Sequence, residues 1–323
     1  MAGLYSVALG HLIPDMINLL LSSWLMLLAL SAQSALAADN KAYCTATAAR
    51  FAACIKPSAT NATIRQYDDE HWVGFDIARQ SDQQALLVFM TGTGGKPPGP
   101  MRFLETAMQA GYRVISLAYN DEPSIAVYCP RRPDPACSEN FRLMRIDGKP
   151  VLPDASIRND AEESISARLL SLLNYLDRQY PQQQWKQYLR EGDIDWSRLS
   201  LAGQSQGAGM AALIAKRTLV ARVILFSSPW DFYLKDGRRQ LAPWIAMSSV
   251  TPVDRWFGGY HAQEATADLL AASYISLKIP ADHVRVFSKA LSGNATGNNP
   301  YHGQGIRNTD YQADWLFFLN EGR

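Results

Sequence analysis

The chain has 323 residues, of which 47% are hydrophobic and 19% are charged. This length accommodates one large domain or two small ones, and the apolar content is sufficient for a substantial core. The formal net charge of +1 gives no electrostatic case for nucleic acid or an anionic membrane surface, so neither is expected as a partner.

The N-terminal segment is expected to direct export. Residues 17–37 are almost continuously apolar and end in Ala35-Leu36-Ala37, which has the A-x-A form of a cleavage site. We therefore expect residues 1–37 to be a signal peptide and residues 38–323 to be the mature chain, secreted or periplasmic. Because no Lys or Arg precedes Lys41, retention of the segment as a membrane anchor is the alternative, and only then is a membrane partner expected.

The four cysteines form two local pairs in the sequence, Cys44 with Cys54 and Cys129 with Cys137. An even number of cysteines in an exported chain predicts disulfides, and local pairing is the simplest of the three possible connectivities. Buried free thiols are the alternative. His, Asp and Glu do not recur at the spacing of metal ligands, so neither a metal site nor a cofactor is expected.

Strand and helix patterns alternate along the mature chain. The first part predicts a short helix at 46–53, strands at 71–78 and 84–90, a glycine-rich loop at 91–100, a helix at 101–110 and a strand at 112–119. Residues 122–153 break this rhythm and predict an ordered insertion held by the second cysteine pair. The remainder predicts helices at 159–180, 185–190, 208–217, 264–273 and 309–320, and strands at 195–202, 221–229, 254–259 and 283–287. The alternation indicates one α/β domain with a mainly parallel sheet that helices cover on both faces.

One motif stands between a predicted strand and a predicted helix. Residues 203–207 read Gly-Gln-Ser-Gln-Gly and fit the G-x-S-x-G nucleophile elbow, in which a strained turn exposes the serine oxygen above the sheet. Glycine is needed on either side of Ser205 because a β-carbon would collide with the strand or the helix.

The elbow after roughly the fifth strand, the early glycine-rich loop and the order of elements resemble the α/β-hydrolase superfamily from about His71 to Asn320. The Asn120-Asp121 corner, the cysteine-containing insertion and Tyr301-His302-Gly303 also resemble a poorly characterised branch of exported bacterial members. The resemblance implies an α/β-hydrolase fold and a Ser205 nucleophile that is activated by a histidine, which an acid orients.

The superfamily order of nucleophile, acid and histidine implies a base late in the chain. His302 lies in a turn-rich loop after the last predicted strand and is the expected base, with His261 as the alternative. The acid is expected to be Glu264, and Asp231 is the alternative. Asp254 and Asp268 are further candidates.

The resemblance also implies an oxyanion hole. One donor is expected to be the backbone N–H of Gln206, directly after the nucleophile. The second should come from the early glycine-rich loop, from Thr93 or Gly94.

Together these residues predict an exported serine hydrolase that cleaves a carboxylic ester through an acyl-enzyme on Ser205. The substrate is expected to be a small-molecule, lipid or polymeric ester. The insertion should border the substrate pocket, and four aromatic residues could supply its apolar walls: Trp230, Phe232, Trp244 and Trp256. Because the acid is not evident from its motif, a non-catalytic binding protein on a hydrolase fold is the alternative.

Overall fold

The structure, a computed structural model, describes residues 42–81, 84–130, 132–149, 151–152, 154, 157, 159–291 and 297–322. The predicted signal peptide, its cleavage site and the expected start of the mature chain lie outside these residues. The described residues from Ala46 onward form one unit. Within the described part of the chain, every helix is too short or too polar to cross a membrane.

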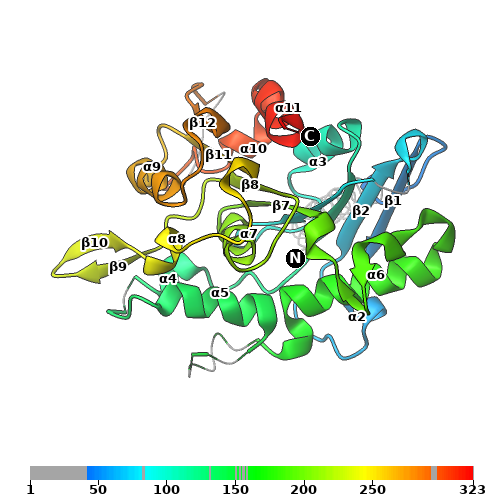
Figure 1. The fold of residues 1–323 in the computed structure, drawn as a ribbon, viewed down its shortest axis with the longest axis horizontal. Helices are drawn as coiled ribbons and strands as arrows, with labels where there is room; N and C mark the ends of the chain where they lie inside the picture. Colours follow the sequence, from blue (N-terminus) through cyan, green and yellow to red (C-terminus); the bar gives the residue numbers. More distant parts are fainter. Residues whose placement is uncertain are drawn as a thin grey trace, which may run out of the picture. The chain divides into compact units, whose positions relative to one another are not determined.

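An eight-stranded sheet organises this unit (Figure 1). Its strands lie side by side in the order β1-β2-β4-β3-β7-β8-β11-β12. From β4 to β12 they are parallel, whereas β2 runs antiparallel to both β1 and β4. The bounds are β1 Arg50–Ile55, β2 His71–Asp76, β3 Leu86–Met90, β4 Arg113–Leu117, β7 Leu199–Gln204, β8 Arg222–Phe226, β11 Trp256–His261 and β12 Val284–Phe287.

Helices pack on both faces of the sheet. Along β3, Leu86, Val88 and Met90 belong to one apolar cluster, and Leu87 and Phe89 belong to the other. The first cluster includes side chains of α5 (Cys137–Asp147), α6 (Ile165–Gln179), α7 (Gln206–Arg217) and α9 (Ala267–Ser276). The second includes side chains of α3 (Met101–Gln109) and α11 (Gln312–Asn320). Burial on both faces explains why the parallel strands are unbroken apolar runs in the sequence.

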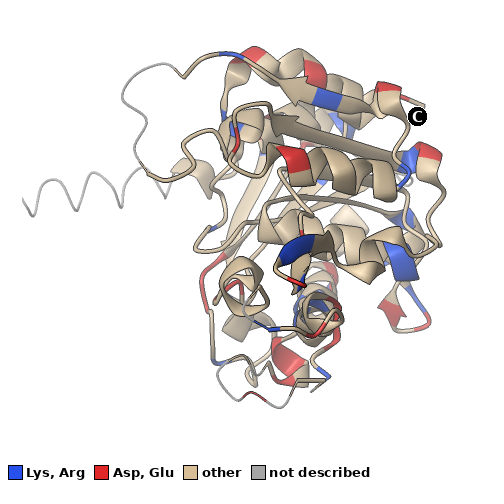
Figure 2. Cartoon of the chain, turned by 90° about the vertical axis from the view of Figure 1, so that its left-hand side faces the viewer, with Lys and Arg blue, Asp and Glu red and all other residues tan. Residues whose placement is uncertain are grey.

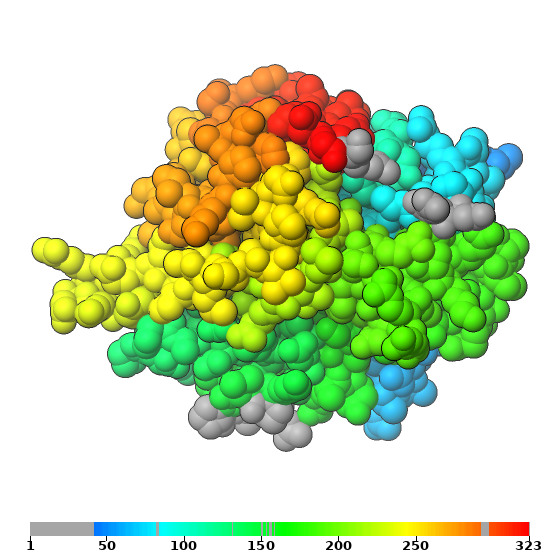
Figure 3. Space-filling model, in the orientation of Figure 1, coloured from blue at the N-terminus to red at the C-terminus, as the bar shows by residue number. Residues whose placement is uncertain are grey.

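Shorter elements connect these layers. The short α-helices are α2 (Pro57–Thr60), α4 (Ile125–Tyr128), α8 (Pro243–Ala246) and α10 (Gln304–Arg307). Two small hairpins pair β5 (Leu189–Arg190) with β6 (Asp193–Ile194) and β9 (Phe232–Lys235) with β10 (Arg238–Leu241), and Figures 1 and 3 show the second extending from the body. Single 3-10 turns are η1 Ile77–Arg79, η3 Ala161–Glu163, η4 Pro181–Gln183, η5 Trp185–Tyr188, η6 Trp196–Arg198, η7 Val253–Arg255, η8 Ala281–His283 and η9 Thr309–Tyr311.

The prediction of a single α/β domain with a mainly parallel sheet is confirmed, but the helix predicted at 46–53 is wrong. That stretch contains most of β1, which pairs with β2 over its whole length. Residue-level propensity favoured a helix there, and pairing with a buried strand overrode it. The insertion at 122–153 is more regular than predicted, because it contains α4 and α5. The β9–β10 hairpin was not predicted.

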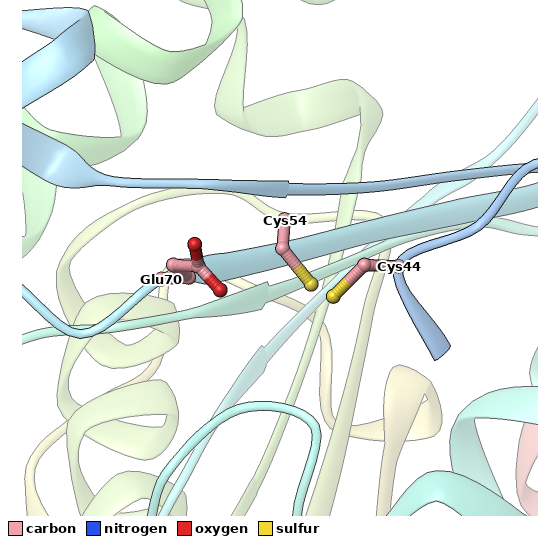
Figure 4. Close-up of side chains that lie close together, drawn as sticks. All are labelled: Cys44, Cys54 and Glu70. Carbon is pink, nitrogen blue, oxygen red and sulfur yellow. The ribbon is translucent and has the colours of Figure 1, made fainter. Parts of the chain in front are cut away.

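The cysteines are oxidised. Cys129 and Cys137 form a disulfide that ties the end of α4 to the first turn of α5. Cys44 and Cys54 are each disulfide-bonded as well, so no cysteine is a free thiol. Figure 4 draws these two residues with Glu70. A disulfide cannot supply the thiolates that a metal ion requires, so we do not assign a metal site to this group.

Charged residues of both signs are intermixed over the elements of the face drawn in Figure 2. This distribution agrees with a net charge near zero.

Candidate active site

Ser205 lies at the carboxyl end of β7, at the point where the chain turns into α7. Its backbone has φ 53° and ψ −123°, a region that residues other than glycine rarely occupy. A backbone held in such a region costs about 1–3 kcal/mol and persists only when its surroundings fix it. Here the Ser205 N–H donates to the Phe226 carbonyl at the end of β8, at 2.8 Å.

The two glycines beside Ser205 are required by close packing. A β-carbon on Gly203 would lie 2.4 Å from the backbone of Gly207. A β-carbon on Gly207 would lie 2.1 Å from the carbonyl oxygen of Met90, at the end of β3. Real β-carbons do not approach other atoms so closely, so only glycine lets the helix begin this near the two strands.

Three side chains from distant parts of the chain form a continuous hydrogen-bonded row. His302 Nε2 lies 2.7 Å from Ser205 Oγ, and His302 Nδ1 lies 2.8 Å from Glu264 Oε2. The Glu264 side chain is fully buried, whereas that of His302 is 27% exposed. Because an ionised carboxylate can only accept, Nδ1 carries the proton and Nε2 is left to accept from the serine hydroxyl.

The other oxygen of Glu264 is also held. Glu264 Oε1 accepts from Ser227 Oγ at 2.6 Å and from the backbone N–H of His261 at 2.9 Å. These two donors come from the chain after β8 and from the end of β11. They compensate for the burial of the carboxylate and fix its orientation toward His302.

His261, the alternative base, has a different place. Its Nδ1 accepts from the Gln263 N–H, and its Nε2 lies 2.9 Å from the Lys289 carbonyl. The ring stacks on Tyr301 with centroids 4.4 Å apart. His261 therefore supports the residue that precedes His302 and does not face the serine.

Asp231, the alternative acid, is bound elsewhere. Arg142 grips it from α5 through two bonds, Nε to Oδ2 at 2.8 Å and a terminal nitrogen to Oδ1 at 2.6 Å. Trp244 Nε1 donates to Oδ2 at 3.1 Å. The remaining acid candidates, Asp254 and Asp268, are exposed on η7 and in the first turn of α9. Of the four acids considered, only Glu264 contacts His302 in the described part of the structure.

The structure describes both segments that were expected to supply oxyanion donors. Gln206 is the first residue of α7, where a backbone N–H has no partner within the helix. Thr93 and Gly94 follow β3 on the glycine-rich loop, which passes close to the serine. A β-carbon on Gly92 would lie 3.0 Å from Ser205 Cβ.

The side chain of Gln206 ties the elbow to the insertion. Its Oε1 accepts from the Ile125 N–H, and its Nε2 donates to the Asp121 carbonyl. Its own carbonyl accepts from Arg142 at 3.0 Å. Hydrogen bonds therefore fix both the side-chain amide and the backbone carbonyl of the residue that follows the serine.

A small, mainly apolar pocket opens beside Ser205. Its lining residues come from α4, α5, the elbow and the segment after β8: Ser124, Ile125, Ala126, Cys129, Pro130, Ser138, Arg142, Ser205, Gln206, Ser228, Trp230, Asp231 and Phe232. The insertion borders it, as predicted. Trp230 and Phe232 form part of the wall, but Trp244 and Trp256 are buried in the core and do not line it.

Asp121, whose backbone carbonyl accepts from Gln206, has a perturbed carboxyl group. Burial, with a smaller contribution from the Glu122 charge, raises the pKa of Asp121 from 3.8 to about 6. Its Oδ2 is buried and lacks a hydrogen-bond partner among the described residues. Asp121 follows β4, so its carboxyl group lies at the same edge of the sheet as the serine.

Sequence reasoning missed Arg142, Ser138 and Ser227. Arg142 and Ser138 lie one turn apart on α5, inside the insertion that showed no sustained period. A serine or a charged residue on such a helix is usually solvated, and only burial distinguishes these two. Ser227 falls near the end of the strand predicted at 221–229. Its role was missed because the contact with Glu264 joins residues 37 positions apart in the sequence.

No family of known proteins and no curated protein matches the sequence. Among solved structures, a putative dienelactone hydrolase from Klebsiella pneumoniae is 14% identical, with 83% of this chain and 98% of that chain covered and a TM-score of 0.42.

Two esterase structures are similar to a comparable degree. Esterase B from Lactobacillus rhamnosis, in a structure with a tributyrin phosphonate, is 11% identical, with 94% of this chain and 91% of that chain covered and a TM-score of 0.45. A Pyrobaculum calidifontis esterase is 12% identical, with 85% of each chain covered and a TM-score of 0.40. None of these similarities bears on the predicted branch of exported bacterial members, which stays a prediction.

The fold is instead evident from the chain itself. A parallel sheet with helices on both faces carries a strand–serine–helix elbow at the carboxyl end of its fifth strand. An acidic residue and then a histidine follow in chain order, each at the same end of the sheet. The chain has the α/β-hydrolase fold.

Proposed function

We propose that this protein is a serine hydrolase that cleaves carboxylic esters through an acyl-enzyme on Ser205. The observation that carries the proposal is the row Ser205–His302–Glu264, with 2.7 Å and 2.8 Å between the hydrogen-bonded atoms. A serine hydroxyl is a weak nucleophile, and it becomes reactive when an adjacent base that a third group orients removes its proton.

In the acylation step, His302 Nε2 takes the proton of Ser205 as Oγ attacks the ester carbonyl. Glu264 holds the ring so that Nε2 is unprotonated before the attack, and it stabilises the imidazolium that forms. His302 then delivers this proton to the departing alkoxide. The carbonyl C–O bond to the alcohol breaks, the alcohol leaves, and the acyl group remains on Ser205.

The negative charge on the carbonyl oxygen requires donors that are already in place. The Gln206 N–H at the start of α7 is one such donor, and the helix dipole adds a favourable field there. Thr93 or Gly94 of the glycine-rich loop supplies the second. In the second half of the reaction, His302 takes a proton from water as the water oxygen attacks the acyl carbonyl. The bond between this carbon and Ser205 Oγ then breaks, His302 returns the proton to Oγ, and the carboxylic acid is released.

Hydrolysis of short p-nitrophenyl esters by the purified chain and its Ser205→Ala variant tests the proposal. Loss of a triad member lowers turnover by about 10⁶-fold in serine hydrolases. We expect a loss approaching this size, and labelling by a fluorophosphonate in the wild-type protein only. Full ester turnover by Ser205→Ala would contradict the serine mechanism. Inertness of the wild type toward all esters would favour a non-catalytic binding protein.

We also propose that the chain is exported and cleaved near Ala38. Its support is the A-x-A pattern at Ala35–Ala37 and a chain without free cysteines, which suits an oxidising compartment. The mass of the mature protein from the periplasm or medium of the host tests this. Recovery of the full-length chain in the membrane fraction would instead indicate a retained anchor.

A further inference from the structure

The pocket beside Ser205 has a polar end that the proposed chemistry does not use. Ser138 lines this pocket and is 3% exposed, and its Oγ lacks a hydrogen-bond partner among the described residues. A buried hydroxyl without a partner is costly, and such groups call for an explanation. A ligand that hydrogen-bonds to Oγ when it occupies the pocket is one explanation.

Arg142 stands beside Ser138 at this end of the pocket. The two residues are four positions apart on α5, so they share one face of the helix. A guanidinium has five N–H groups. Within the described structure, Arg142 uses one on Gln206 and two on Asp231, which leaves one N–H on each terminal nitrogen.

The charge at this end is already balanced. Arg142 and Asp231 form an ion pair whose side chains are 1% and 3% exposed, and both line the pocket. A carboxylate on the substrate would be repelled by the Asp231 carboxylate, because the positive charge of Arg142 is already neutralised by Asp231. A neutral polar group avoids this repulsion. A hydroxyl is the smallest such group that can both accept from Arg142 and donate to Ser138 Oγ.

The pocket is also small. Its free volume of about 30 Å³ holds about two water molecules. Its walls are mainly apolar up to the polar end, and they include Ile125 and Phe232. The enclosed part of this space fits a few heavy atoms with one polar group.

We propose that this pocket selects a short hydroxyacyl group, whose hydroxyl binds Ser138 and Arg142. The proposal rests on the serine-hydrolase function and narrows its substrate class to esters of short hydroxy acids. We assign the acyl half to the pocket because that half stays bound to Ser205 after the alcohol has left.

A comparison of ethyl butyrate with ethyl 2- and 3-hydroxybutyrate tests the proposal, with kcat/KM followed by acid release. One hydrogen bond between neutral groups contributes about 1 kcal/mol. Because both Ser138 and Arg142 can bind the hydroxyl, we expect the wild-type enzyme to prefer one of the two hydroxy esters over ethyl butyrate by about tenfold or more. In Ser138→Ala, the ratio of hydroxy ester to butyrate should fall by about fivefold, because one of the two hydrogen bonds to the hydroxyl is lost.

Ser273→Ala is the matched control. Ser273 is another fully buried serine whose hydroxyl lacks a partner among the described residues, but it lies on α9 and does not line the pocket. Its removal should leave the ratio unchanged. An equal fall of the ratio in Ser273→Ala would mean that general loosening of the fold, and not Ser138, sets the preference.

The remaining outcomes separate this inference from the proposed function. Hydrolysis of ethyl butyrate without any preference for a hydroxy ester overturns the pocket assignment and leaves the serine hydrolase intact. A stronger preference for ethyl 3-oxobutyrate, or for a hydroxyl in the alcohol half such as hydroxyethyl butyrate, overturns it too. Inactivity on every ester overturns both.

Discussion

At the scale of single residues, the site depends on one buried carboxylate with three donors. One oxygen of Glu264 is hydrogen-bonded to His302. The other accepts hydrogen bonds from Ser227 and from the backbone N–H of His261. Asp231 is just as buried, but it accepts hydrogen bonds from Arg142 and Trp244. The two acids differ in their hydrogen-bond partners, and partners that come from distant positions cannot be read from a local motif.

We expect Glu264→Gln to lower kcat by about 10³–10⁴-fold, as found when an amide replaces the acid of a serine triad. The amide has nearly the same shape, but its NH₂ group can face His302 Nδ1 and favour the tautomer protonated on Nε2. That tautomer cannot accept the serine proton. Steady-state kinetics on a p-nitrophenyl ester, with circular dichroism to verify the fold, measures the effect.

Glu163→Gln is the control for this substitution. Glu163 is as buried as Glu264 but pairs with Arg168, and it caps the backbone of Arg65 and Gln66. Its replacement should reduce stability and leave kcat of the folded enzyme unchanged within about threefold. The reason is that the contacts of Glu163 are separate from those of the triad, and substitutions at separate sites act independently. A kcat for Glu264→Gln as high as that of Glu163→Gln would show that Glu264 is not the triad acid.

At the scale of elements, the insertion is a scaffold for one wall of the pocket. α5 begins at Cys137, next to Ser138, and it presents Arg142 one turn later. The disulfide to Cys129 therefore restrains the end of the helix that lines the pocket. α4 contributes Ile125 and Ala126 to the same wall, and Gln206 binds its first backbone N–H.

Replacement of this disulfide in Cys129→Ala/Cys137→Ala should reduce the free energy of unfolding by about 2–3 kcal/mol, because the bond closes a short loop of the unfolded chain. It should also raise KM several-fold, since the first turn of α5 loses its anchor. Urea unfolding and steady-state kinetics measure the two effects.

Cys44→Ala/Cys54→Ala is the matched comparison. Cys54 lies on β1 at the edge of the sheet, and neither of the two residues lines the pocket. A loss of stability without a change in KM is expected. If both double variants raised KM equally, the wall would not depend on the restraint at Cys137.

At the scale of the whole molecule, the functional groups collect at the carboxyl ends of the parallel strands. Ser205 follows β7, Ser227 follows β8, Glu264 follows β11 and Asp121 follows β4. This is the edge at which open α/β sheets bind ligands. It also concentrates buried acids, and Asp121 is one whose burial opposes ionisation.

The stability of the molecule should therefore depend on pH through Asp121. Its pKa is about 6 in the folded protein against 3.8 for an ordinary aspartate, so the folded state holds this proton more tightly than the unfolded state. Between about pH 4 and pH 6 the unfolded state loses the proton first, and the stability falls as the pH rises. Above about pH 6 the carboxyl is ionised in both states, and the loss of stability caused by the buried charge stays constant.

We expect Asp121→Asn to melt at a higher temperature than the wild type at pH 8, because the neutral amide removes the cost of a buried charge. The difference should become small near pH 4, because the carboxyl is then protonated in the folded state and about half protonated in the unfolded state. Thermal unfolding of both proteins at pH 4 to 8 measures it. A difference that is independent of pH would mean that Asp121 does not titrate in this range.

Much of this organisation could be predicted from local patterns. Unbroken apolar runs such as 84–90 predicted buried parallel strands, and the glycines around Ser205 predicted the elbow. These patterns are local because a strand buried on both faces and a tight turn each restrict consecutive residues. The stretch at 46–53 was misassigned because its strand is stabilised by pairing with β2 rather than by its own propensity.

The sequence by itself determined the α/β architecture, the elbow and the places of Ser205 and His302, because each rests on short-range backbone geometry or on chain order. Only the tertiary structure decided that Glu264 and not Asp231 lies against His302, and that Ser138 and Arg142 line the pocket. These assignments depend on which buried side chains meet across strands and helices far apart in the chain. Most buried polar groups are hydrogen-bonded, and only the packed fold shows which partner each one has.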